Sequence, residues 1–214
     1  MAIEFDATSA GSQVSTTSKS WSHTCTGSNL ILFVGIQITA NNATISGVTY
    51  AGVAMTKIAS IDWPGSGVGS SALWYIVAPA TGANNIVVSA SPAAYIDGFG
   101  VSYTGASQTG IPDSSNTGSA NTLSTTVVAT DCWTIMHLAS SAGAAVTYNS
   151  GTTARVVNWA NSDGMLDSNG TVSTGSQSLG MSQSGSNTYR GVIASFAPAA
   201  ASTIYIPDLR LAFL

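Results

Sequence analysis

Charged side chains are scarce in this chain. They make up 7% of its 214 residues, whereas soluble domains usually carry about 25%. The five basic residues are Lys19, Lys57, Arg155, Arg190 and Arg210. They are spread along the sequence, so no basic stripe could neutralise several phosphates, and we expect no nucleic-acid partner. Solubility must depend on Ser, Thr, Asn and Gly, helped by a formal net charge of -4.

Long apolar runs are also missing. The longest, Leu30-Ile31-Leu32-Phe33-Val34-Gly35-Ile36, is far shorter than the ~20 residues that a membrane-spanning helix needs. We therefore expect no membrane contact. The hydrophobic fraction of 44% nevertheless excludes an intrinsically disordered chain and provides for an ample core.

The first residues do not have the pattern of a secretion leader. Met1-Ala2-Ile3-Glu4-Phe5 is followed by Asp, Ser and Thr, whereas a leader needs a basic start and an apolar stretch of about 7 to 15 residues. We expect synthesis in a host cytoplasm without a signal peptide. An uncharged polar surface suits an extracellular setting or a crowded assembly. A virion component satisfies both conditions, because it is made inside the host and leaves by lysis.

Cysteine is limited to Cys25 and Cys132. Two residues cannot form a disulfide framework, and they are too isolated for a zinc site, which needs four paired ligands. The simplest prediction is two buried thiols, as expected in a reducing compartment. Each cysteine stands at the start of an apolar strand, so a disulfide is the alternative if those strands are neighbours.

What the sequence does contain is β-strand periodicity. Short β-branched runs alternate apolar with polar residues and end at Gly, Asn, Pro or Ser, while helical periodicity is almost absent. About sixteen short strands are predicted, among them separate strands at 3–8, 19–24, 84–89 and 94–103. Without intervening helices a parallel sheet is excluded, so we predict an all-β, antiparallel β-sandwich of jelly-roll-like type.

Two connections shape the predicted organisation. Tyr50-Ala51-Gly52-Val53 is typical of a tight hairpin in which Gly52 adopts a positive φ. Residues 104–121, rich in Ser, Thr, Gly and Asn, are predicted to cross between two halves of one domain. We therefore expect a single β-sandwich domain over residues 1–198, with a linker between two domains as the alternative.

Several segments resemble a known family. They are Trp21-Ser-His-Thr-Cys-Thr-Gly-Ser-Asn-Leu-Ile-Leu-Phe-Val-Gly35, Val48-Thr-Tyr-Ala-Gly-Val-Ala-Met55, Leu73-Trp-Tyr-Ile-Val-Ala-Pro79, Val101-Ser-Tyr-Thr-Gly105 and Gly191-Val-Ile-Ala-Ser-Phe-Ala-Pro198. Together they resemble a β-sandwich (jelly-roll-like) structural module of tailed-phage virion proteins and bacterial surface proteins. The resemblance covers residues 3–198. It implies a non-enzymatic module used in virion decoration, in fibres or in cell-surface display, with no catalytic residues to transfer.

Sets of catalytic or metal-binding residues are not evident. His23 and His137 are the two candidate general bases, and both are predicted to be structural. No Gly-x-Ser-x-Gly elbow occurs in a strand-turn-helix setting. Asp163 and Asp167 are near each other, but their spacing does not fit an EF-hand, so a polar hairpin loop is predicted. We expect no catalytic residues, no metal and no cofactor.

The five tryptophans could pack in the core or bind sugars. Four lie within apolar or alternating strands and are predicted to be core residues: Trp21, Trp74, Trp133 and Trp159. Trp63 lies in a loop-like segment, Ile61-Asp-Trp-Pro-Gly-Ser-Gly67. An exposed indole there could contact a glycan or a neighbouring subunit.

The C-terminal residues 199–214 lie outside the family pattern and end without a polar tail. We predict either a closing strand of the sandwich or an arm that contacts another subunit. With Trp63, its apolar residues form the predicted interface: Ile204, Ile206, Leu209, Leu211, Phe213 and Leu214.

These observations favour a bacteriophage virion structural protein, specifically a capsid decoration (cement) protein. Its expected partners are further copies of itself, as a homo-oligomer, and other virion proteins such as the major capsid protein. The alternative is a receptor- or glycan-binding domain of a tail fibre or cell-surface protein, with a host-surface glycan as partner. A hydrolase is the least favoured class.

Overall fold

The computed structural model describes residues 1–39, 42–64, 69–141, 145–158, 163–185 and 187–200. It is all-β, with 71% of the described residues in strands and no helix among them, and its paired strands are antiparallel. The predicted antiparallel β-sandwich class is confirmed. Among these residues, no helix is long and apolar enough to cross a membrane.

The first half of the chain forms one seven-stranded sheet with the order β4-β3-β7-β2-β6-β5, and β1 pairs with β7. Its strands are β1 (Glu4–Cys25), β2 (Ile31–Thr39), β3 (Thr44–Tyr50), β4 (Val53–Ala54), β5 (Thr56–Asp62), β6 (Ser70–Val77) and β7 (Gly82–Thr104). The first part of β7 pairs with β3 and its second part pairs with β2, while β1 follows it along the other edge. The sheet therefore folds over on itself and forms two layers.

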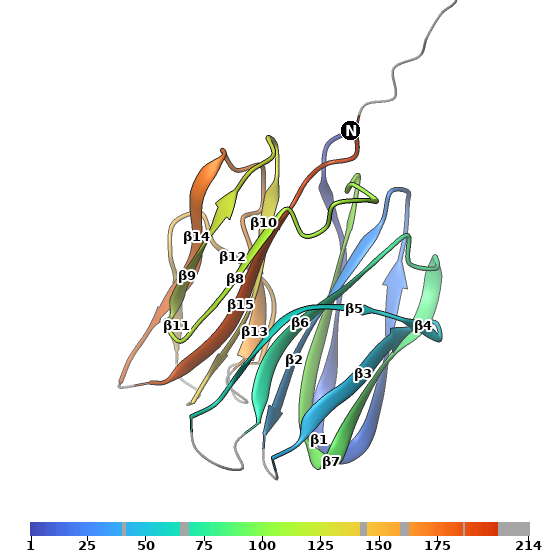
Figure 1. The fold of residues 1–214 in the computed structure, drawn as a ribbon, viewed down its shortest axis with the longest axis vertical. Helices are drawn as coiled ribbons and strands as arrows, with labels where there is room; N and C mark the ends of the chain where they lie inside the picture. Colours follow the sequence, from blue (N-terminus) through green and yellow to red (C-terminus); the bar gives the residue numbers. More distant parts are fainter. Residues whose placement is uncertain (40–41, 65–68, 142–144, 159–162, 186, 201–214) are drawn as a thin grey trace, which may run out of the picture.

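The second half of the chain adds two smaller sheets, with the orders β12-β13-β10-β15-β8 and β11-β14-β9. Their strands are β8 (Ser114–Gly118), β9 (Thr122–Val127), β10 (Trp133–Ser140), β11 (Val146–Tyr148), β12 (Thr153–Asn158), β13 (Asp163–Asp167), β14 (Gly175–Gln183) and β15 (Tyr189–Phe196). Figure 1 shows these strands on the left and those of the first half on the right.

Three apolar cores lie between the layers, and the alternation of side chains explains them. In β2, Val34 and Ile36 belong to the core inside the first half, while Phe33 on the opposite face belongs to the core between the halves. In β10, Ile135 belongs to that same middle core, and Met136 faces a third core inside the second half. Strands covered on both faces need mostly apolar sequences, and β2 and β10 are buried along nearly their whole length.

Several predicted strand boundaries are wrong for identifiable reasons. The strands predicted at 3–8 and 19–24 are one strand, β1, because its polar middle residues pair with β7 at the margin of the sheet. The strands predicted at 84–89 and 94–103 are likewise one strand, β7. Pro92 interrupts the pattern in the sequence, but it lies where β7 changes partner from β3 to β2 and has no paired residue in either ladder.

The two predicted connections have different outcomes. The hairpin between β3 and β4 is confirmed, with φ of 51° at Ala51 and 79° at Gly52, the left-handed pair that a type I′ turn requires. The crossover predicted at 104–121 contains a strand that was missed, β8, which pairs with β15. Its sequence, Ser-Ser-Asn-Thr-Gly, has no apolar residue to signal a strand.

The single-domain prediction for residues 1–198 stays a prediction, and the middle core gives it a test. This core contains residues from both halves, such as Phe33 and Phe196, whose ring centroids are 4.9 Å apart. We expect one cooperative unfolding transition by circular dichroism and by tryptophan fluorescence, because separating the halves would expose these rings. Limited proteolysis between residues 104 and 114 that released two independently folded halves would contradict the prediction.

Candidate functional site

A Ser-His-Asp group lies in the middle of the molecule, between the two halves. The Ser71 hydroxyl on β6 is 2.8 Å from Nδ1 of His137 on β10. On the other side of the ring, Nε2 is 3.7 Å from an oxygen of Asp163 on β13. All three residues are fully buried. No local pattern indicates this grouping, because the three residues come from strands that are separated in the chain.

Close packing of the two sheets places the His137 ring. Gly35 on β2 lies directly below it, and a Cβ added to Gly35 would be 2.6 Å from Cδ2 of the ring. Glycine within a strand often marks such a close approach. The histidine is therefore enclosed between β2 and its own sheet and has no exposed surface.

Burial favours the uncharged forms of His137 and Asp163. Desolvation lowers the pKa of His137 to about 3. The pKa of Asp163 is raised well above its usual value, first by burial and then by the charge of Asp97. Burial also lowers the pKa of Lys19, although Asp97 and Asp163 act in the opposite direction. Because a neutral histidine faces a carboxyl group that favours its protonated form, the 3.7 Å contact is not an ion pair, and it is too long for a hydrogen bond.

The arrangement does not suit acyl transfer. A nucleophilic serine needs a substrate at its oxygen and a histidine that can accept a proton near neutral pH. Ser71 has no exposed surface, and the pKa of His137 is about 3. Both Asp163 oxygens and Nε2 of His137 also lack hydrogen-bond partners among the described residues. The group is best explained as a costly buried polar cluster at the junction of the halves.

His23, the other candidate base, is held in a fully directed chain of hydrogen bonds. Trp21 Nε1 donates to the Ser9 hydroxyl over 3.1 Å, so that hydroxyl can donate to His23 Nδ1 at 2.8 Å. His23 Nε2 then donates to Ser102 at 3.0 Å, and Ser102 donates to Asp6 at 2.7 Å. Burial lowers the pKa of His23 to about 4, although Asp6 opposes this. The neutral ring has a partner at each nitrogen, as expected for a structural histidine.

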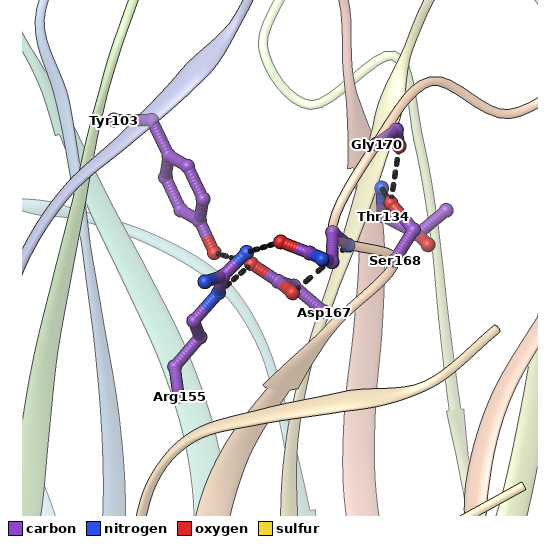
Figure 2. Close-up of polar contacts among 7 residues, drawn as sticks. Tyr103, Thr134, Arg155, Asp167, Ser168 and Gly170 are labelled. Atoms are coloured by element: carbon purple, nitrogen blue, oxygen red, sulfur yellow. Dashed lines mark hydrogen bonds and ion pairs between the residues drawn. The ribbon is translucent and has the colours of Figure 1, made fainter.

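An arginine clamp joins the halves at one edge of the middle core (Figure 2). Asp167 on β13 accepts hydrogen bonds from Tyr103 at 2.6 Å and from Arg155 Nε at 2.5 Å. The Asp167 side chain is fully buried and that of Arg155 is 12% exposed. The guanidinium also lies 4.4 Å from the ring centroid of Phe5 on β1. Tyr103 and Phe5 belong to the first half, so the clamp connects both halves.

The clamp corrects the sequence prediction for this segment. Asp163 and Asp167 do not lie in a polar hairpin loop; they begin and end the buried strand β13. Asp167 is neutralised by Arg155 from the neighbouring strand β12, and its second oxygen accepts the Asn169 backbone N–H at 3.0 Å. Among the described residues, no group of three or more His, Cys, Asp or Glu could hold a metal ion.

We predict that a chelator will leave the melting temperature unchanged. The Asp167 carboxylate already has protein donors on both oxygens, so a cation would have to displace them. The measurement is a thermal melt with and without EDTA. A fall of many degrees that calcium restores would contradict the prediction.

Both cysteines are free and buried, which agrees with the simpler of the two sequence predictions. Burial raises the pKa of the Cys25 thiol. For Cys132, burial and then the neighbouring Asp113 raise the pKa to about 12. Because the thiolate is the reactive form, burial and a raised pKa disfavour reaction at either residue.

The predictions for the tryptophans and for the interface residues have mixed outcomes. Trp21, Trp74 and Trp133 are core residues as predicted, while Trp159 lies outside the described residues. Trp63 is half-buried rather than fully exposed, with the guanidinium carbon of Arg190 5.6 Å from its ring centroid. The six tail residues of the predicted interface also lie outside the described part: Ile204, Ile206, Leu209, Leu211, Phe213 and Leu214.

Open hollows occur on the surface of the described residues. The terminal groove, formed by residues 1–3, 129–131, 171 and 197–200, has a volume of about 650 Å³. The side hollow, formed by residues 43–45, 57, 60, 62, 70 and 72, has a volume of about 230 Å³. Neither contains Ser71, His137, His23 or Asp167. The buried polar groups and these surface hollows are therefore separate.

Comparison of the chain with protein-family models, with curated proteins and with solved structures finds no significant match.

Proposed function

We propose that the chain is a non-enzymatic structural protein of a bacteriophage virion, and specifically a capsid decoration (cement) protein. The observation that carries the proposal is the location of its reactive chemistry. His137 and Ser71 have no exposed surface, and His23 is 1% exposed. Side chains buried to this extent cannot reach a substrate.

The surface gives further support. Only 7% of the residues are charged, so few contacts between this surface and a neighbouring protein would involve charges. A decoration protein needs a stable body and a surface that packs against neighbours, and a polar, weakly charged surface suits close packing because few charges must be desolvated. The clamp around Asp167 and the middle core would resist the separation of the halves.

A receptor- or glycan-binding domain is the alternative. The side hollow supports it with sugar-compatible groups, namely Lys57, Ser60 and Asp62. Sugar-binding surfaces also use exposed aromatic rings, however. Trp21, Trp74 and Trp133 are buried and Trp63 is half-buried, so this alternative is less well supported.

Electron microscopy of virus particles that contain the chain tests both the decoration role and the receptor-binding alternative. Gold-labelled antibody against the protein should mark the shell at many sites per particle, with particles lacking the gene as the control. Labelling at the tail alone would replace the decoration role with receptor binding. Absence of the protein from purified particles would refute the virion proposal.

A further inference from the structure

Both ends of the described chain meet at one end of the molecule, beside the terminal groove. The N-terminal ammonium of Met1 donates to the Ala199 carbonyl oxygen at 3.1 Å, and the Ala199 N–H donates to the Gly105 carbonyl oxygen at 2.7 Å. Ala199 and Ala200 themselves line the groove. The described part of the chain therefore ends at the groove, at Ala200, close to the N-terminus (Figure 1).

The lining of the groove suits an apolar segment that carries one positive charge. Ile3, Ala129, Ala197 and Pro198 supply small and apolar surface. The exposed carboxylate of Asp131 lies among them. Val128, next in the chain to this lining, is 70% exposed, so the apolar surface extends beyond the groove.

The C-terminal segment has the complementary composition. Between Thr203 and Leu214 it contains six large aliphatic or phenyl side chains, one acidic residue, Asp208, and one basic residue, Arg210. Leaving so many apolar side chains in water is unfavourable. The segment needs a covering surface, and the groove offers apolar walls with a carboxylate that can pair with Arg210.

We propose that the terminal groove of one copy binds residues 201–214 of a second copy, so that two chains exchange these segments reciprocally. Between Pro198 and Pro207 the sequence is Ala-Ala-Ala-Ser-Thr-Ile-Tyr-Ile, in which Ser202 alone belongs to the residue types that favour a sharp reversal into the chain's own groove. Extended at about 3.3 Å per residue, the segment can reach a partner tens of ångströms away.

The position of the groove also favours exchange between two copies. Because the segment starts at the rim of the surface that would bind it, a two-fold axis near Ala200 brings each segment to the groove of the other copy. Such a contact is self-complementary and closes at two chains. It is formed by the purified protein alone, so it does not depend on the virion proposal.

Disulfide trapping in the full-length protein shows whether residues 201–214 bind the terminal groove of their own chain or that of a second copy. Thr130, an exposed groove residue, is changed in one variant (Thr130→Cys), and Ile206→Cys or Leu211→Cys is made in another. The two variants are mixed and oxidised. A covalent heterodimer is expected, with Val53→Cys in place of Thr130→Cys as a control, since Val53 is 57% exposed but outside the groove. The native thiols, buried with raised pKa values, should not compete.

Two other results would contradict binding to a second copy. If the mixture yields no heterodimer while the double variant Thr130→Cys/Leu211→Cys closes within one chain, the segment fills its own groove and the proposal is wrong. If neither forms and light scattering shows a monomer at high concentration, the groove is not the acceptor. Either result would leave the virion proposal to its own test.

The charge pair provides an independent measurement. Asp131→Asn should weaken the dimer two- to fivefold by analytical ultracentrifugation, the range expected for one exposed ion pair. Asparagine also tolerates the positive φ of 58° at this position. Glu4→Gln removes the same charge at an exposed site outside the groove and should have no effect. Equal affinities for all three proteins would contradict the Arg210–Asp131 contact.

Discussion

Changing Asp167 to Asn should lower the free energy of unfolding by about 3 kcal/mol, which for a chain of this length lowers the melting temperature by roughly 6 to 12 °C. The Asn side chain would leave the guanidinium of Arg155 without its anionic partner in a site where Asp167 is fully buried. Losing one member of a buried pair costs ~3 to 5 kcal/mol. We take the lower end because the Arg155 side chain is 12% exposed.

Urea unfolding of matched variants checks this result. Asp62→Asn, at an exposed carboxylate, should change the free energy of unfolding by less than ~0.5 kcal/mol. The double variant Arg155→Met/Asp167→Leu removes both charges and should be closer to the wild type than Asp167→Asn is. A single variant as stable as the wild type would show that the clamp contributes little.

The fold class could be predicted from the sequence because the alternation of side chains is a local signal. The mostly apolar sequences of β2 and β10 predict strands, and the residue types around Gly52 predict the tight turn. The sequence of β8 does not predict a strand, since its polar residues pair through the backbone with β15, far along the chain. Backbone pairing of a polar edge strand produces no pattern in its side chains.

The polar groups of the interior could be predicted only in part. The structural role of His23 and His137 was expected, but their partners were not. Ser9 and Ser102 bind opposite nitrogens of His23, from positions that the sequence does not connect. Asp, Ser, Asn and Gly cluster around Asp167, and this composition predicts a loop. Nothing local indicates that Arg155 on the adjacent strand neutralises it.

The buried histidines should make the protein sensitive to acid. Histidine has a pKa of about 6.5 in an unfolded chain, whereas that of His137 in the fold is about 3. The unfolded state therefore binds more protons between these values, so stability is complete above pH 6.5 and falls as the pH decreases. Asp163, whose pKa is raised, acts in the opposite direction, because the folded state keeps its proton and loses stability as the pH rises.

Comparison with His137→Gln isolates the contribution of His137, because Asp163 is present in both proteins. The wild type should lose on the order of 1 kcal/mol per pH unit relative to His137→Gln between about pH 6 and pH 4. The measurement is the urea unfolding free energy at several pH values. His23→Gln is the matched control. The stability difference between the wild type and His23→Gln should also change as the pH falls, but it should stop changing near pH 4, because the pKa of His23 is about 4. Parallel pH profiles of the wild type and His137→Gln would mean that His137 is protonated within the fold, with Asp163 ionised as its partner at 3.7 Å.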